Sequence, residues 1–216
     1  MEEKIFQVFE EKLKYLISYP QGFDEGKKYP LVIFLHGRGE RGETTEKLIN
    51  HTSFQCAKVH QDAKGYLLLA PLCPSGDWNQ WMFILLRLID AARNLPYVDK
   101  THVHITGCSM GGYGTWEICI LRPHWFASAM PLCSGGIPAF SKQLVDLPIR
   151  AFHGLCDKTV DPIESLQMAK AINLAGGYAE LILFPQAPHN CWEPAYSNGK
   201  NFDWLLSFTK ESCEDQ

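Results

Sequence analysis

Short apolar runs recur along the chain, and most of them end at a glycine or a proline. The run PLVIFLHG is continuous, which is typical of a strand buried on both faces. LKYLISYP alternates apolar and polar positions, as a half-buried strand does. The pattern predicts strands at residues 13–20, 30–37, 65–71, 102–107, 127–135, 148–154 and 179–185.

Segments with helical patterning lie between these strands. ESLQMAKAINLAGG ends on a glycine pair, a common helix stop, and GYGTWEICILRP stops at a proline. The predicted helices cover residues 45–61, 78–95, 112–123, 164–177 and 202–210. Because strands and helices alternate, we expect an α/β fold with a mainly parallel central sheet and helices on both faces. The early strands are expected to form an antiparallel edge.

Length and composition narrow the classes of protein. The 216 residues contain no repeat or linker, so we expect a single domain over residues 1–216. Hydrophobic residues make up 46% and charged residues 20%, which allows a large core. The net charge of -4, with scattered basic residues, argues against nucleic-acid partners. Since no apolar run approaches roughly 18–20 residues, we expect no membrane span.

The N-terminus and the cysteines indicate the compartment. The first residues, MEEKIFQVFEEKLKYLISYP, begin acidic and lack the apolar core of a signal peptide. We therefore expect a cytoplasmic protein, unless a leader has been removed. The eight cysteines form no C-x-x-C pair and mostly lie in apolar surroundings. They are interpreted as reduced thiols rather than as disulfides or a zinc site, and no metal or organic cofactor is expected.

The segment ITGCSMGGYG contains the motif G-x-S-x-G between a predicted strand and a predicted helix. In this setting the central serine sits on a sharp turn, and its neighbours must lack bulk. The following helix directs its first N–H groups at the site, where an oxyanion can form. We therefore expect Ser109 to be the exposed nucleophile and Cys108 to point away and pack. The alternative is a glycine-rich turn with a solvated serine.

A serine nucleophile needs a histidine base. In folds with this motif the acid and then the histidine follow the serine along the chain. His189 lies in a loop after the last predicted strand, where a base belongs. His124 is expected at the surface, and His153 is expected to make a structural hydrogen bond at the end of a strand. The predicted base is His189.

The carboxylate that orients the base must lie between the serine and the histidine. HGLCDKTVDP offers Asp157 and Asp161 after a predicted strand. Asp161 precedes Pro162 and suits a helix cap. Asp146 comes before that strand, at the wrong end of the sheet. The predicted acid is Asp157.

The oxyanion hole needs a second backbone donor, from the loop after an early strand. LHGRGERGE suits this role, because Gly37 and Gly39 let the backbone turn its N–H groups inward. The expected donors are the N–H groups of Arg38 and Met110. His36 precedes the serine and is interpreted as fixing the loop. The side chain of Arg38 either faces an acidic group of the substrate or is solvated.

These segments together resemble the α/β-hydrolases, specifically small bacterial esterases and peptidases of the prolyl-oligopeptidase type. That group is related to feruloyl and polyhydroxybutyrate esterases and to the phospholipase/carboxylesterase group. The resemblance runs through KKYPLVIFLHGRGERGE, ITGCSMGGYGTW, FASAMPLCSGG, PIRAFHGLCDKTVDP, APHNCWEPAY and WLLSF, nearly the whole chain. It implies an α/β-hydrolase fold and places the family's triad on Ser109, Asp157 and His189.

The chain departs from its relatives at three points. Where they often have Asp-x-x-Arg, Asp99 is followed by His102, which is expected to weaken a structural ion pair. Met110 stands where acyl-protein thioesterases favour glutamine. The stretch after PLCPSGDW leaves room for only a minimal lid. Peptidases of this type usually carry a propeller or larger cap, for which this chain has no room, and this favours an esterase.

Three tryptophans are candidates for the substrate pocket: Trp78, Trp81 and Trp192. Trp192 follows the predicted base by three residues and suits a pocket wall, whereas core or rim packing is the alternative for all three. With Gly37 and Gly39 it forms the expected substrate-binding set. The predicted function is hydrolysis of small carboxylic esters. The alternatives are an aminopeptidase or oligopeptidase and a non-catalytic binding protein of the same fold, and exposed aromatics permit a homodimer.

Overall fold

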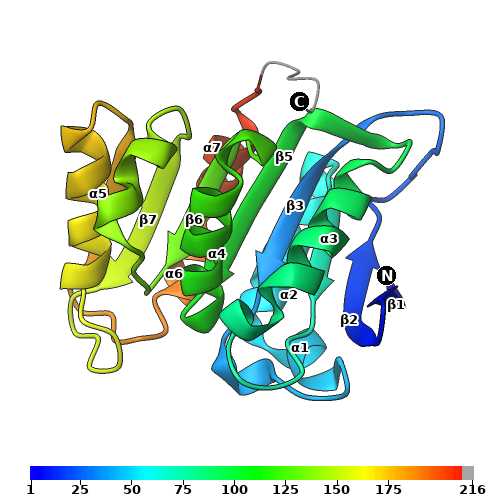
Figure 1. Ribbon diagram of the computed structural model, residues 1–216, viewed down its shortest axis with the longest axis horizontal. Coiled ribbons are helices and arrows are strands. Elements are labelled where there is room, and N and C mark those ends of the chain that lie inside the picture. The colour runs from blue at the N-terminus through cyan, green and yellow to red at the C-terminus, as the bar shows by residue number, and fades with distance from the viewer. Residues whose placement is uncertain (211–216) are drawn as a thin grey trace.

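The computed structural model describes residues 1–210. Within them, eight strands form one sheet in the order β1-β2-β4-β3-β5-β6-β7-β8 (Figure 1). Strands β3 to β8 pair in parallel, whereas β2 is antiparallel to both β1 and β4. The prediction of a parallel sheet with an antiparallel edge is confirmed. The strands are β1 (Glu2–Val8), β2 (Glu11–Ser18), β3 (Tyr29–Leu35), β4 (Leu67–Pro71), β5 (Val98–Cys108), β6 (Ser128–Leu132), β7 (Ile149–Gly154) and β8 (Ala179–Phe184).

Helices cover both faces of the sheet (Figure 1). α3, α4 and α5 pack on one face, and α2, α6 and α7 pack on the other. Along β3, Leu31 and Ile33 join the first core while Val32 and Phe34 join the second, because successive side chains of a strand point to opposite faces. The helices are α1 (Glu46–Asn50), α2 (Thr52–Lys64), α3 (Met82–Arg93), α4 (Met110–Leu121), α5 (Ile163–Leu174), α6 (Trp192–Ser197) and α7 (Gly199–Leu206).

Two predicted elements are wrong in detail. The helix expected over residues 45–61 is broken at His51, whose backbone is extended and whose ring accepts a hydrogen bond from the Ser53 N–H at the start of α2. The helix expected over 78–95 begins as a 3₁₀ turn at Trp78–Trp81. In both places a local hydrogen bond replaces a regular helical turn that the apolar pattern alone would continue.

β1 was not predicted from the sequence. Five of its seven residues are exposed and the other two are half-buried, so it lacks the apolar face that the pattern search needs. It is held by backbone pairing with β2. Three other element boundaries differ by a few residues from the prediction. α4 begins at Met110, directly after the serine, α7 begins at Gly199, and β6 ends at Leu132.

The parallel strands bring distant parts of the chain to one edge of the sheet. β3, β5, β7 and β8 all end there, and ligands bind at this edge in open α/β sheets. The loops that follow these four strands carry the predicted oxyanion loop, Ser109, Asp157 and His189.

Three general properties hold for the described residues. No helix within 1–210 is both long enough and apolar enough to cross a membrane. No group of three histidine, cysteine or acidic side chains in this range is placed to hold a metal ion. The seven cysteines in this range are free thiols, and Cys213 lies outside it.

Candidate active site

Ser109 stands alone between the end of β5 and the first residue of α4. Its backbone has φ 54° and ψ −119°, a conformation that costs a non-glycine residue about 1–3 kcal/mol. A hydrogen bond from its N–H to the Leu132 carbonyl (3.0 Å) ties the turn to β6. The strain is held by the sheet on one side and the helix on the other, which is the geometry of an exposed nucleophile.

The glycines of the motif are needed because the turn passes close to β3. A Cβ atom at Gly111 would lie 1.9 Å from the Leu35 carbonyl oxygen, and one at Gly107 would lie 2.4 Å from the Gly111 oxygen. Neither contact is possible between real atoms. The two glycines therefore allow the helix to start directly against the neighbouring strand.

The neighbouring thiol has a different environment. Cys108 is buried in the core formed with α2, α6 and α7. Burial raises the pKa of its thiol to about 12, so it is protonated near neutral pH. Of the two adjacent candidates, Ser109 faces the cleft, and Cys108 packs as expected.

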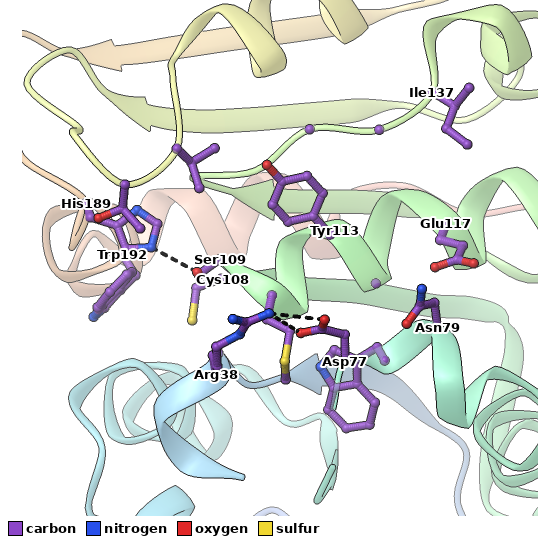
Figure 2. A pocket seen from close by; sticks show the side chains of 18 of the residues that line it. Arg38, Asp77, Asn79, Cys108, Ser109, Tyr113, Glu117, Ile137, His189 and Trp192 are labelled. Atoms are coloured by element: carbon purple, nitrogen blue, oxygen red, sulfur yellow. Dashed lines mark hydrogen bonds and ion pairs between the residues drawn. The ribbon is translucent and has the colours of Figure 1, made fainter. Parts of the chain in front are cut away.

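The three predicted side chains form a continuous chain of hydrogen bonds. His189 Nε2 lies 2.8 Å from Ser109 Oγ, and His189 Nδ1 lies 2.6 Å from Asp157 Oδ2. The Nδ1–H donates to the carboxylate, so Nε2 is left to accept the serine proton. Figure 2 shows the Ser109–His189 contact at one end of a pocket.

Asp157 is buried and held from two sides. Its Oδ1 accepts the backbone N–H groups of Thr159 (2.8 Å) and Val160 (3.0 Å). Burial works to raise the pKa of Asp157, but these two bonds and the bond from His189 outweigh it, so the pKa lies below its ordinary value. The carboxylate is therefore ionised and fixed in orientation. Asp161 instead accepts from the Ile163 N–H at the start of α5, as expected of a cap.

His153 also touches the acid. Its Nε2 lies 3.2 Å from Asp157 Oδ2 and 3.1 Å from the Val160 carbonyl, and its Nδ1 lies 2.7 Å from Ser165 Oγ. The ring is completely buried. The structural hydrogen bond expected at this residue is present, and it links the end of β7 to α5 and to the acid's loop.

Replacement of His153 by leucine is expected to lower the free energy of unfolding by about 1–3 kcal/mol, because buried polar partners lose their hydrogen bonds. Denaturant unfolding followed by circular dichroism measures it. Replacement of the surface residue His124 by leucine serves as the control and should change the value little. Equal stability of the two variants would show that the buried contacts of His153 contribute nothing.

The predicted oxyanion loop lies against the nucleophile. A Cβ atom at Gly37 would be 3.8 Å from Ser109 Cβ, so the loop passes directly beside the turn. Arg38 begins a 3₁₀ turn and Met110 begins α4. The first N–H groups of a helix have no acceptor within it, which leaves both free to face a ligand. Gly39 also lines the pocket.

His36 fixes this loop, as expected. Its Nδ1–H donates to the Gly37 carbonyl (2.6 Å), and its Nε2 accepts the Cys73 N–H (2.9 Å). Burial lowers the pKa of His36 to about 4, so the neutral ring keeps one donor and one acceptor. The Trp78 indole N–H donates to the His36 carbonyl (3.1 Å) and closes the network.

The Arg38 side chain is 64% exposed and pairs with an acidic side chain of the protein itself. Its Nη2 lies 2.8 Å and 3.1 Å from the two carboxylate oxygens of Asp77 (Figure 2). The ion pair bridges the loop after β3 and the loop after β4 across the pocket. The side chain is therefore solvent-exposed, as one of the two alternatives from the sequence had it, and its guanidinium also pairs with Asp77.

The pocket is a cleft of about 1150 Å³. Trp192 lines it beside the base, with ring centroids 5.6 Å apart and nearly perpendicular planes. Trp78 is a buried residue that also reaches the cleft, whereas Trp81 is not among the lining residues. All three expected substrate-binding residues, Gly37, Gly39 and Trp192, line the cleft.

Many of the residues that line the cleft were not predicted from the sequence. Tyr113 and Glu117 lie on α4, one and two turns after Ser109, and both line it. Their spacing of four residues from the serine is the signal that identifies them, because such residues share a helix face. Ile137 and Phe140, at the start of a 3₁₀ helix (Pro138–Leu144) after β6, left no comparable signal.

The departure at Asp99 has little structural effect. His102 Nδ1 lies 2.9 Å from Asp99 Oδ2, so the histidine keeps the contact that an arginine makes in relatives. The Thr101 N–H and hydroxyl also donate to Asp99 Oδ1, and its pKa is lowered. The ion pair expected to be weakened is therefore replaced by a compact local network.

The mostly parallel sheet, the strained serine between β5 and α4, and the predicted acid and base after later strands are the arrangement of an α/β-hydrolase fold. A solved thermostable esterase is 30% identical, with a TM-score of 0.86 over 97% of this chain and 63% of that one. Est1E from Butyrivibrio proteoclasticus is 16% identical, with a TM-score of 0.74 over 95% of this chain and 98% of that one. The second likeness concerns the fold alone.

Sequence comparison finds peptidases. Dipeptidyl-peptidase 5 of Aspergillus fumigatus is 31% identical over 113 residues, 45% of this chain and 15% of that protein. The chain spans about a sixth of the length of such curated relatives. No family model matches the chain. The chain therefore has the α/β-hydrolase fold, and in sequence it is similar both to an esterase and to dipeptidyl peptidases.

Proposed function

We propose that the protein is a serine hydrolase that cleaves carboxylic esters through an acyl-enzyme. The observation that carries the proposal is the hydrogen-bond chain from Ser109 Oγ through His189 to Asp157, with distances of 2.8 and 2.6 Å. In this mechanism His189 takes the serine proton as Ser109 attacks the carbonyl carbon. Asp157 holds the imidazolium that forms. No metal or organic cofactor takes part.

The negative charge that develops on the carbonyl oxygen needs donors that are already in place. The N–H groups of Arg38 and Met110 fill this role, and each such donor contributes about 3–4 kcal/mol to lowering the barrier. His189 then protonates the leaving alcohol, and a water molecule attacks the acyl-enzyme by the same steps in reverse. The strained Ser109 and the fixed loop at His36 keep these groups arranged before the substrate binds.

Ester cleavage is favoured by the 30% identity to an esterase along nearly the whole chain. Cleavage of peptides is the second candidate, because the curated relatives that match part of the chain are dipeptidyl peptidases. The two reactions use the same groups and differ in the leaving group.

The test is labelling with a fluorophosphonate, followed by peptide mapping, and then comparison of matched esters and peptide anilides. We expect an adduct on Ser109, and kcat/KM for p-nitrophenyl and feruloyl esters well above that for peptide p-nitroanilides. The reverse order would favour the peptidase. An unlabelled protein, or an adduct on Cys108 alone, would refute the proposed nucleophile.

A further inference from the structure

The cleft extends well beyond the reacting groups. Figure 2 shows Ser109 and His189 at one end and Glu117, Asn79 and Ile137 at the other. Glu117 follows Ser109 by eight positions along α4, which is about 12 Å along the helix axis. We call the region lined by Asn79, Glu117, Ile120, Leu121, Ile137 and Phe140 the far arm. A short ester fills only the end that holds Ser109.

Glu117 is the ionisable group in the far arm. Its carboxylate is half-buried, and burial alone raises its pKa. Among residues 1–210 no side chain pairs with it or donates a hydrogen bond to it. A partly desolvated carboxylate without a partner is unfavourable, and a cation placed beside it would offset that cost.

The other charged groups of the cleft also favour a cationic ligand over an anionic one. Arg38 is the one lysine or arginine among its described lining residues, and its guanidinium is paired with the Asp77 carboxylate. Glu40 is buried beside the oxyanion loop and also lines the cleft, where its Oε1 lies 3.4 Å from His51 Nε2 and its Oε2 lies 3.8 Å from His36 Nδ1. The cleft thus has acidic groups near both ends and no free arginine or lysine to attract an anion.

The walls of the far arm are apolar and uncovered. Leu121, Ile137 and Phe140 are 42%, 54% and 44% exposed, respectively, although each is a large hydrophobic side chain. A carbon chain or ring lying along α4 would cover them and carry its end group to Glu117. The far arm therefore suits a ligand with an apolar body that contacts these walls and a charged end group that contacts Glu117.

We propose that the far arm binds the positively charged end of an ester substrate, an ammonium or guanidinium group joined to the scissile ester by an apolar spacer, and that Glu117 is the residue that selects it. This assignment rests on the proposed function, because it takes the bond at Ser109 as the one that is cleaved. It places Glu117 as a specificity residue with no part in the chemical step.

The test compares esters that differ only in their end group. Two series carry methylene spacers shorter than, equal to and longer than about 12 Å, one on the acyl side and one on the alcohol side, each ending in an amine, a hydroxyl or a methyl group. For the matching spacer in one series, we expect the amine to raise kcat/KM about tenfold over the methyl. Glu117→Gln should abolish this preference, and Glu117→Lys should transfer it to a carboxylate end.

Two controls isolate the effect. The first control is internal: the preference is the ratio of kcat/KM for the amine and the methyl ester within each protein, so any change in the basal rate of Glu117→Gln cancels. Glu11→Gln removes the same charge from an exposed site in the β1–β2 hairpin and should leave the amine preference intact. An equal preference in the wild type and in Glu117→Gln, a hydroxyl preferred over the amine, or an equal loss in Glu11→Gln would each overturn the assignment.

A binding measurement separates this assignment from the proposed function. Calorimetry with a spacer-matched alkylammonium ion on the Ser109→Ala protein needs no turnover. We expect binding that is about tenfold tighter than in the Ser109→Ala, Glu117→Gln double variant. Binding that depends on Glu117 without any ester cleavage would leave the subsite standing and refute the esterase. Ester cleavage together with alkylammonium binding that does not depend on Glu117 would refute the subsite and leave the esterase standing.

Discussion

Replacement of Ser109 by alanine is expected to lower kcat for a short p-nitrophenyl ester by about 10⁶-fold, because the nucleophile of the acyl-enzyme is lost. The residual rate should stay above that in water, since the oxyanion donors and the cleft remain. Initial rates measured over a range of substrate concentrations test this. Unchanged turnover would refute Ser109 as the nucleophile.

The adjacent thiol provides the control. Cys108→Ala removes the only other nucleophile on the turn, and we expect kcat to remain within a few-fold of wild type, because the buried thiol is protonated and faces the core. A loss as large as that of Ser109→Ala would mean that the turn presents the sulfur instead. The two variants together decide which of the adjacent residues attacks.

A second variant at the same position tests the strain. Ser109→Gly removes the same hydroxyl but tolerates φ 54°, so the free energy of unfolding should rise by about 1 kcal/mol relative to Ser109→Ala. Both variants should be equally inactive. Equal stability of the two would show that the turn stores no strain.

The candidate triad was predictable from the sequence because each of its members follows a strand that the apolar pattern marks clearly. β5, β7 and β8 end just before Ser109, Asp157 and His189, and parallel strands place their carboxyl ends at one edge. The order of serine, acid and base then left few choices. The apolar pattern was most reliable for the buried strands of the sheet.

The rest of the site depends on contacts that the pattern does not encode. The pairing of Arg38 with Asp77 joins loops 39 residues apart, and His153 reaches the acid through the local turn after β7. The far arm combines a helix face carrying Glu117 with the start of a 3₁₀ helix near Ile137. Such surfaces are formed by residues that are distant in the sequence, so they can be identified only from the three-dimensional structure.

Asp157→Asn is expected to lower kcat by about 10⁴-fold with little change in KM. Oδ1 of this residue accepts the N–H groups of Thr159 and Val160, so the asparagine should keep its carbonyl oxygen there. Its NH₂ group then occupies the position of Oδ2 and faces His189 Nδ1. Two donors cannot face each other, so the imidazole must move its proton to Nε2. A base with a proton already on Nε2 cannot take another from Ser109.

The same variant tests the electrostatics of the acid through stability. Because the pKa of Asp157 is lower in the folded state than in the unfolded chain, ionised Asp157 stabilises the fold above the unfolded value, near pH 4. This contribution is lost as the pH falls through the lowered pKa of the folded state. Asparagine does not titrate, so the difference in unfolding free energy between wild type and Asp157→Asn should shrink as the solution is acidified.

Urea unfolding at a series of pH values from neutral to acid measures that difference. A matched control is Asp161→Asn, since Asp161 caps α5 and has no contact with His189. A difference between wild type and Asp157→Asn that stays constant with pH would mean that the bonds from Thr159, Val160 and His189 do not overcome the burial of the carboxylate. A difference that shrinks, together with the loss of kcat, would show that one ionised carboxylate both stabilises the fold and orients the base.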